Sequence, residues 1–304
     1  MDIPDMLIIG AGPAGLTAAI YGLRAGLSAV VFDRGVYGGQ VAQTAEVENY
    51  PAILRISGPD FAQAIHQQAA ELGADIRMEA VERVELDGAV KRLFTPEGIY
   101  EGRTVVIANG AKRRLLGCEG EEAFTGRGVS YCATCDGAFF RGRDVAVVGG
   151  GNTALEDALY LANLCRRVTI IHRRDSFRGQ KLLADAVGRH GNIDVLFRHE
   201  VVRIEGERAV GGVVVRGPDG QRRRLEIAGV FIAIGYEPDN ALFAARLPLD
   251  ESGYILAGED CRTPIPGVYA AGDNRAKPLR QIVTAAADGA VAASQAANHI
   301  LAGL

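Results

Sequence analysis

A glycine-rich turn near the start of the chain constrains the fold most strongly. The apolar run Met6–Ile9 predicts a buried parallel strand, and the motif G-x-G-x-x-G follows it over residues 10–15. We expect an alanine-rich helix next, from about Leu16 to Ala25. This order of strand, glycine turn and helix is typical of a Rossmann-like dinucleotide-binding unit. A second predicted strand, Ala29–Phe32, ends at Asp33, where such units place an acid for a ribose hydroxyl.

Each glycine of this turn has an expected task. Gly10 permits the tight turn, Gly12 lets the backbone approach a pyrophosphate, and Gly15 lets the helix pack closely on the strand. Pro13 and Ala14 complete the motif. The N–H groups of a helix start favour phosphate. This unit alone does not decide between FAD and NAD.

A second unit of the same kind begins with a predicted strand over residues 144–148. The motif G-x-G-x-x-A follows it, and a helix is expected from about Ala154 to Asn163. The next strand, Val168–Ile171, ends in a cationic run: His172, Arg173, Arg174 and, four residues later, Arg178. An NAD site would place a carboxylate here, whereas guanidinium groups suit a 2′-phosphate. The pattern therefore predicts a preference for NADPH over NADH.

Between these units lies a C-x-x-C pair, Cys132 and Cys135, followed directly by Asp136. This spacing is typical of dithiol oxidoreductases, and the carboxyl group could exchange a proton with a departing thiolate. A zinc site would need four ligands, and the other three cysteines are scattered. We expect Cys165 to be a buried apolar residue on a helix, and Cys118 and Cys261 to be bystanders. No metal is expected.

Length and charge narrow the class of protein. A chain of 304 residues predicts about two domains. A net charge of −4 offers no basic field for nucleic acid or an anionic membrane. Neither a signal peptide nor a bilayer-spanning apolar run is evident, and five cysteines are too few for a disulfide-stapled secreted fold. The expected location is cytoplasmic.

Taken together, these residues resemble the bacterial low-molecular-weight thioredoxin reductases over essentially the whole chain. The resemblance rests on the two glycine motifs and the cationic run, and further on these segments: Gly38-Gly39-Gln40, Glu48-Asn49, Cys132 to Gly137, Ile234 to Pro238, Gly272-Asp273 and Arg280-Gln281. It implies FAD on the first unit, NADPH on the second, thioredoxin as the disulfide substrate, and a homodimer.

The resemblance also implies roles for single residues. It assigns FAD to Gly10, Gly12, Pro13, Ala14, Gly15, Asp33, Gly39, Gln40, Asn49, Gly110, Gly272, Asp273, Arg280 and Gln281. It assigns NADPH to Gly149, Gly151, Asn152, Thr153, Ala154, His172, Arg173, Arg174, Arg178, Ile234 and Gly235. Cys135 would be the thiol nearest the flavin and Asp136 the acid or base. Which cysteine first attacks thioredoxin stays open.

The expected architecture is α/β, with two Rossmann-like, three-layer nucleotide-binding domains. The FAD domain is split over residues 1–114 and 243–304, and the NADPH domain, residues 115–242, is inserted in it and carries the redox pair. Because disulfide and nicotinamide must reach one flavin, we expect the inserted domain to rotate about hinges near residues 112–117 and 240–244.

Alternative functions share most of these features. One is a reductase of the same fold with ferredoxin as donor or another disulfide partner. Another is a small-molecule dithiol oxidase, and a third is a non-enzymatic flavoprotein that senses redox state.

Overall fold

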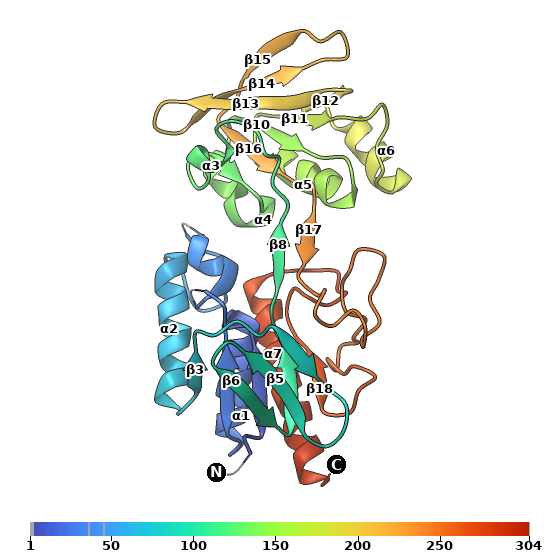
Figure 1. Cartoon of the computed structure of the whole chain (residues 1–304). Helices are drawn as coiled ribbons and strands as arrows, with labels where there is room; N and C mark the ends of the chain where they lie inside the picture. Colours follow the sequence, from blue (N-terminus) through green and yellow to red (C-terminus); the bar gives the residue numbers. More distant parts are fainter. Residues whose placement is uncertain (1–2, 36, 45, 304) are drawn as a thin grey trace. The chain divides into compact units, whose positions relative to one another are not determined.

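The computed structural model describes residues 3–35, 37–44 and 46–303 (Figure 1). Internal contacts divide the chain into two compact units. Unit 1 comprises Met1–Lys112 and Glu237–Leu304, and unit 2 comprises Arg113–Tyr236. The chain passes between them in two short strands that pair with each other, β8 (Ala111–Arg113) and β17 (Tyr236–Pro238). One unit is therefore inserted into the other.

Unit 1 is built on a five-stranded parallel sheet in the order β18-β7-β1-β2-β3. Its strands are β1 (Met6–Ile9), β2 (Ala29–Phe32), β3 (Asp75–Arg77), β7 (Thr104–Ile107) and β18 (Val268–Ala270). The helices of this unit are α1 (Pro13–Arg24), η1 (Gly39–Gln43), α2 (Gly58–Glu71) and α7 (Ile282–Leu301). A small antiparallel sheet is formed by β4 (Arg83–Glu85), β5 (Lys91–Thr95) and β6 (Gly98–Gly102).

Alternating side chains of β1 explain the layers of unit 1. Met6 and Ile8 pack into a core with the alanine-rich faces of α1 and α7, which lie side by side (Figure 1). Leu7 and Ile9 pack on the opposite face, with Leu93 of β5 and with residues from the C-terminal part of the chain. A strand buried on both faces has to be apolar throughout, as the sequence of β1 is.

Unit 2 repeats this plan on a parallel sheet in the order β12-β11-β10-β16-β9. The strands are β9 (Val129–Ser130), β10 (Asp144–Val148), β11 (Arg167–His172), β12 (Ile193–Phe197) and β16 (Gly229–Ile232). The helices are α3 (Glu121–Phe124), α4 (Ala133–Asp136), η2 (Gly137–Phe140), α5 (Asn152–Ala162) and α6 (Lys181–Arg189).

The second face of this sheet is covered by an antiparallel sheet. It consists of β13 (Glu200–Gly206), β14 (Val210–Arg216) and β15 (Arg222–Glu226). Val145 and Val147 of β10 pack with α5, whereas Ala146 and Val148 pack with β13 and β14. Unit 2 therefore also has three layers.

The predicted α/β class with two three-layer units is confirmed, and two local expectations are corrected. Helix α1 begins at Pro13 rather than Leu16, because proline suits the first helical position. Helix α5 runs from Asn152 to Ala162, so Cys165 lies in the turn after it rather than on it, although Cys165 is buried as expected. In the part of the chain that the structure describes, every helix is too short or too polar to cross a bilayer.

Candidate active site

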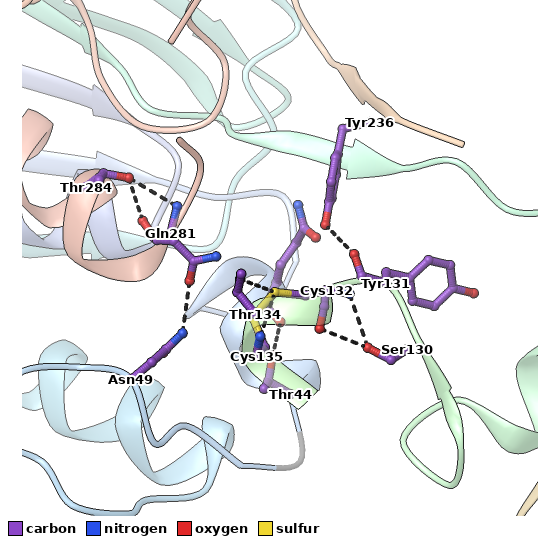
Figure 2. The surroundings of a disulfide bond; sticks show 11 residues. Thr44, Asn49, Ser130, Tyr131, Cys132, Thr134, Cys135, Tyr236, Gln281 and Thr284 are labelled. Carbon is purple, nitrogen blue, oxygen red and sulfur yellow. Dashed lines mark hydrogen bonds between the residues drawn. A yellow bond between two sulfur atoms is a disulfide. The ribbon is translucent and has the colours of Figure 1, made fainter. Parts of the chain in front are cut away.

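Cys132 and Cys135 form a disulfide, with their Cα atoms 5.3 Å apart. Helix α4 is a single turn that starts directly after Cys132, and Cys132 is its N-cap. The backbone N–H of Cys135 donates to Sγ of Cys132 at 3.2 Å, and Oγ1 of Thr134 lies 3.4 Å from the same sulfur (Figure 2). Cys132 therefore opens a helical turn.

The residues just before Cys132 are held from several sides. The hydroxyl of Ser130 accepts from the N–H of Cys132 at 3.1 Å and donates to its carbonyl at 3.3 Å. The hydroxyl of Tyr236 donates to the carbonyl of Tyr131 at 3.1 Å (Figure 2). The Arg113 guanidinium lies over the Tyr131 ring, 4.3 Å from its centre. Arg113 belongs to β8 and Tyr236 to β17. Both of these strands therefore contact Tyr131, the residue just before Cys132.

Glu121 completes this arrangement, although no motif in the sequence marks it. Its side chain is buried, with 4% of the residue exposed. Its carboxylate accepts from the hydroxyl of Tyr131 at 2.8 Å and from the N–H groups of Leu116 and Gly117 at 2.9 and 2.7 Å. Burial, with the carboxylate of Glu121, raises the pKa of Tyr131 to about 12. The segment after β8 is thus tied to the residue preceding Cys132.

Two carboxyl groups on neighbouring helices have raised pKa values. Burial raises the pKa of Asp136 on α4, and a hydrogen bond with Ser130 opposes this. Burial, and to a lesser extent Glu156, raises the pKa of Asp157 on α5 to about 7. Helices α4 and α5 contact each other. With its pKa at about 7, Asp157 is partly protonated near neutral pH, and a protonated carboxyl group can act as an acid.

The first glycine turn has the geometry expected of it. Gly10 has a φ of +109°, and a Cβ there would lie 2.3 Å from the carbonyl of Ala108. A Cβ on Gly15 would lie 1.8 Å from the carbonyl of Gly10, so helix and strand are in contact at this point. A Cβ on Gly12, by contrast, would meet no atom of the described residues within 4 Å. Gly12 therefore faces open space, where a phosphate could approach the backbone.

Several other residues predicted to bind FAD contact this turn or one another. The carboxylate of Asp33 accepts from the N–H of Ala11 at 2.7 Å, and Gly39 lies next to Gly12. The side chain of Asn49 donates to Oε1 of Gln281 at 3.2 Å (Figure 2). Gln281 also forms a reciprocal cap at the start of α7 with Thr284. The amide of Gln40 donates to the carbonyl of Ala111, one residue beyond Gly110, which has a φ of +68°.

The turn at Gly272 and Asp273 is fixed by a buried charge cluster. The N–H of Gly272 donates to the carboxylate of Asp288 at 2.9 Å. Arg275 binds the two oxygens of Asp288 at 2.8 Å each, and Lys277 binds it at 2.8 Å. Burial acts to raise the pKa of Asp288, but the two cations outweigh it and the pKa is lowered. Asp288 therefore stays ionised and holds the turn.

Asp273 itself has a free acceptor. Its Oδ1 atom is buried and has no hydrogen-bond partner in the described part of the chain. Burial raises the pKa of Asp273. Arg280 stacks on the Tyr254 ring at 3.8 Å and donates to the carbonyls of Asp273 and Arg275 at 3.4 and 3.3 Å. A buried acceptor without a donor fits a ligand hydroxyl, since unpaired buried polar atoms are rare in proteins.

The second glycine turn has the same arrangement as the first, with one glycine in close contact and one facing open space. Gly149 has a φ of +151°, and a Cβ there would lie 2.3 Å from the carbonyl of Ala233. Gly151 again faces open space, since a Cβ there would have no atom within 4 Å in the part of the chain that the structure describes. The N–H groups of Arg178 and Gly179 donate to the carbonyl of Gly150 at 2.7 and 3.1 Å. The arginine-bearing loop is thereby folded onto the glycine turn.

The residues around this loop separate into buried and exposed sets. His172 is 7% exposed, its ring lies against Gly150, and its Nε2 donates to the carbonyl of Ser176 at 3.1 Å. Burial lowers the pKa of His172, and the nearby arginines act in the same direction. Arg173, Arg174 and Arg178 are exposed and have no ion pair among the described residues. His172 thus packs against the glycine turn, whereas the three arginines are exposed and can bind an anion.

The remaining predicted contacts lie at both ends of this unit. Asn152, Thr153 and Ala154 form the first turn of α5, and Oδ1 of Asn152 accepts from the N–H of Gln180 at 2.7 Å. Ile234 packs partly into the core, and the carbonyl of Gly235 accepts from the N–H of Arg114 at 3.1 Å.

The other three cysteines are free thiols away from the disulfide. Cys165 and Cys261 are buried and Cys118 is partly buried. Burial raises their pKa values, to about 11 for Cys118 and Cys165 and to about 12 for Cys261. Raised pKa values make these thiols poor nucleophiles near neutral pH.

Comparison with known proteins agrees with this site. The chain matches the pyridine nucleotide-disulphide oxidoreductase family over residues 4–289. It is 42% identical to a thioredoxin reductase of Peptoclostridium acidaminophilum, with 98% of each chain covered. It is 44% identical to a thioredoxin reductase of Mycolicibacterium smegmatis, with 97% of this chain and 96% of the other covered. The crystal structure of a thioredoxin reductase from Streptococcus pyogenes matches with a TM-score of 0.94 and 41% identity over 99% of both chains.

The two nucleotide-type turns and the Cys132–Cys135 disulfide define a disulfide oxidoreductase that uses a flavin and a pyridine nucleotide. The chain belongs to the pyridine nucleotide-disulphide oxidoreductase family and, within it, to the thioredoxin reductases of the low-molecular-weight bacterial type. The disulfide on α4 fits the redox-active disulfide of such an enzyme.

Proposed function

We propose that the chain is an NADPH-dependent thioredoxin-disulfide reductase with FAD as its flavin. The observation that carries this proposal is the Cys132–Cys135 disulfide, which lies in the same unit as three exposed, unpaired arginines folded onto a glycine turn. Guanidinium groups at this position favour the 2′-phosphate that distinguishes NADPH from NADH. We further propose a homodimer, as the family resemblance implies.

The FAD domain in this proposal comprises residues 1–114 and 243–304. The open space at Gly12 suits a pyrophosphate, and the unpaired Oδ1 of Asp273 suits a flavin-side hydroxyl. Asn49 and Gln281 contact each other within this domain and would contribute amide groups. The NADPH domain comprises residues 115–242, where Gly151 offers the matching open space.

Bound NADPH and FAD together supply the two electrons that convert the Cys132–Cys135 disulfide to a dithiol. One thiolate of the dithiol then attacks the disulfide of thioredoxin and forms a mixed disulfide. The other cysteine displaces it, which restores the Cys132–Cys135 bond and releases thioredoxin as a dithiol. Cys135 is the proposed thiol nearest the flavin. Asp136, whose pKa is raised by burial, gives its proton to the departing thiolate.

An anaerobic assay tests this function directly. The purified flavoprotein is mixed with NADPH and the disulfide dye DTNB, with and without thioredoxin, and thiol release is followed. We expect fast release only when NADPH and thioredoxin are both present. If NADPH bleaches the flavin but thiol is not released, the disulfide partner is a different one. If NADPH fails to bleach the flavin, the NADPH assignment is wrong, and a ferredoxin donor or a dithiol oxidase has to be tested.

A further inference from the structure

Arg198, which follows the end of β12, has an unusual backbone conformation. Its φ is +56°, and within the described residues only Ala52 and Cys261 share a positive φ without being glycine. Side chains other than glycine, asparagine and aspartate rarely occupy this left-handed region. Such outliers persist where surrounding contacts impose them, and they gather at functional sites.

The contacts that impose this conformation come from the cationic loop. The N–H of Arg198 donates to the carbonyl of Arg174 at 2.8 Å, and the next N–H along the chain, that of His199, donates to the carbonyl of His172 at 3.1 Å. His172 also pairs with Phe197 in the ladder between β11 and β12. Arg198 is therefore carried to the edge of the loop that bears Arg173, Arg174 and Arg178.

This loop contains one carboxylate among its cations. Asp175 lies between Arg174 and Arg178 and is exposed. Its Oδ1 accepts from the hydroxyl of Ser176 at 3.2 Å, and its Oδ2 pairs with Nη2 of Arg198 at 3.4 Å. Without Arg198, the charge of Asp175 would repel an incoming phosphate or capture one of the three unpaired arginines.

We propose that Arg198 is a specificity-determining residue for the 2′-phosphate of NADPH and that it acts by neutralising Asp175. This inference rests on the proposed NADPH function. It makes Arg198 a positioning and charge-balancing residue, distinct from the three arginines that would touch the phosphate. A carboxylate a few ångströms from a dianion in water opposes binding by about three- to tenfold in affinity, and Arg198 removes that opposition.

Equilibrium binding of two probes to the intact flavoprotein tests the inference. The probes are 2′,5′-ADP, which carries the phosphate in question, and 5′-AMP, which lacks it. We expect Arg198→Ala to weaken 2′,5′-ADP about three- to tenfold and to leave 5′-AMP unchanged. Arg198→Gly should behave alike while relieving the left-handed backbone, so it serves if the alanine variant folds poorly. The matched control is Arg216→Ala, which removes another exposed arginine of the same unit, paired with Glu200 at 2.8 Å.

A double variant tests whether Arg198 acts through Asp175. Adding Asp175→Asn to Arg198→Ala should restore most of the 2′,5′-ADP affinity, since the charge that Arg198 balances is then gone. If recovery fails, or if both probes weaken equally in Arg198→Ala, the proposed action through Asp175 is overturned. If the wild-type protein prefers 2′,5′-ADP but Arg198→Ala keeps that preference, only the role of Arg198 fails. If the wild-type protein binds both probes equally, the NADPH assignment itself fails.

Discussion

The backbone N–H of Cys135 donates to Sγ of Cys132 over 3.2 Å, so one sulfur of the redox pair caps the helical turn that carries the other. After reduction, the same N–H stabilises negative charge on Sγ of Cys132, because hydrogen bonds to a charged acceptor are stronger than those to a neutral one. Cys132 also lies at the start of the turn, next to the exposed Thr134. We therefore expect Cys132 to be the thiolate that attacks thioredoxin.

Cys132→Ser separates the two halves of the reaction. The variant should still let NADPH bleach the flavin, but it should lose thioredoxin reduction, because a single thiol cannot complete the exchange. Stopped-flow absorbance of the flavin and steady-state thioredoxin turnover measure the two halves. Cys118→Ser, which removes a thiol outside the pair, should keep both activities. Thioredoxin turnover that survives in Cys132→Ser would refute the role given to the pair.

Alanine substitutions at Gly151 and Gly149 should have different effects, the first on nucleotide binding and the second on stability. Gly151→Ala places a methyl group in open space, so it should change the free energy of unfolding by about 1 kcal/mol or less while lowering NADPH affinity at least about tenfold. Gly149→Ala drives a Cβ against the carbonyl of Ala233 at a φ of +151° and should destabilise the fold by about 2 kcal/mol or more. Thermal unfolding and nucleotide titration provide the measurements. NADPH binding by Gly151→Ala at wild-type affinity would show that no phosphate approaches there.

Replacing Glu121 should lower the free energy of unfolding far more than replacing the neighbouring Glu122. Glu121→Gln leaves one acceptor oxygen for three donors, so we expect a loss of about 1.5–3 kcal/mol in the free energy of unfolding. Tyr131→Phe, which removes one of those donors, should cost about 1 kcal/mol alone and less in the Glu121→Gln background. Glu122→Gln is the control, because Glu122 is exposed and its change should stay within about 0.5 kcal/mol. Urea unfolding compares all four; equal effects of the two glutamate changes would contradict the buried role.

The strands that the sequence predicts well are those buried on both faces. The ranges expected for β1, β2 and β10 match the structure, and the range expected for β11 differs only at its ends, because a fully covered parallel strand must be apolar throughout. The antiparallel sheets β4–β6 and β13–β15 were not predicted. Charged side chains interrupt them, as in Arg222–Glu226, and only tertiary packing decides which face they present.

Asp157 should make stability depend on pH in a defined direction. Its pKa rises from an ordinary 3.8 to about 7 in the folded chain, so folded and unfolded states both carry the proton below about pH 3.8. Above that, the unfolded state ionises first, and Asp157 destabilises the fold increasingly until about pH 7. Asp157→Asn should therefore raise the Tm by an amount that grows between pH 4 and 7 and then levels off, equivalent to on the order of 1–4 kcal/mol.

The matched control for this pH series is Asp185→Asn, which removes an exposed carboxylate on α6. Its effect on the Tm should be small, because surface substitutions change stability little. If the gain of Asp157→Asn were independent of pH, the raised pKa would not be its cause.

The residues of the candidate site also differ in how well the sequence predicts them. Glycine turns, the C-x-x-C pair and the arginine run could be found from sequence because a fixed local spacing carries their chemistry. Glu121, Asp157 and Arg198 could not, since their importance comes from burial and from partners distant in the chain. Asp288 does carry a sequence signal: it is the single acidic residue of α7, in a helix composed mostly of alanine and apolar side chains.

The insertion of one unit into the other also bears on how the chain folds as it is synthesised. Unit 2 is one continuous stretch, so its core is complete once residue 236 has left the ribosome. Unit 1 cannot complete its core until the C-terminal part of the chain is made. Strand β18 is an outer strand of its parallel sheet, and α7 packs along α1. Until both are made, the apolar faces of α1 and β7 have no cover. The N-terminal segment is thus the part most exposed to aggregation during synthesis, and it becomes stable only when the last helix arrives.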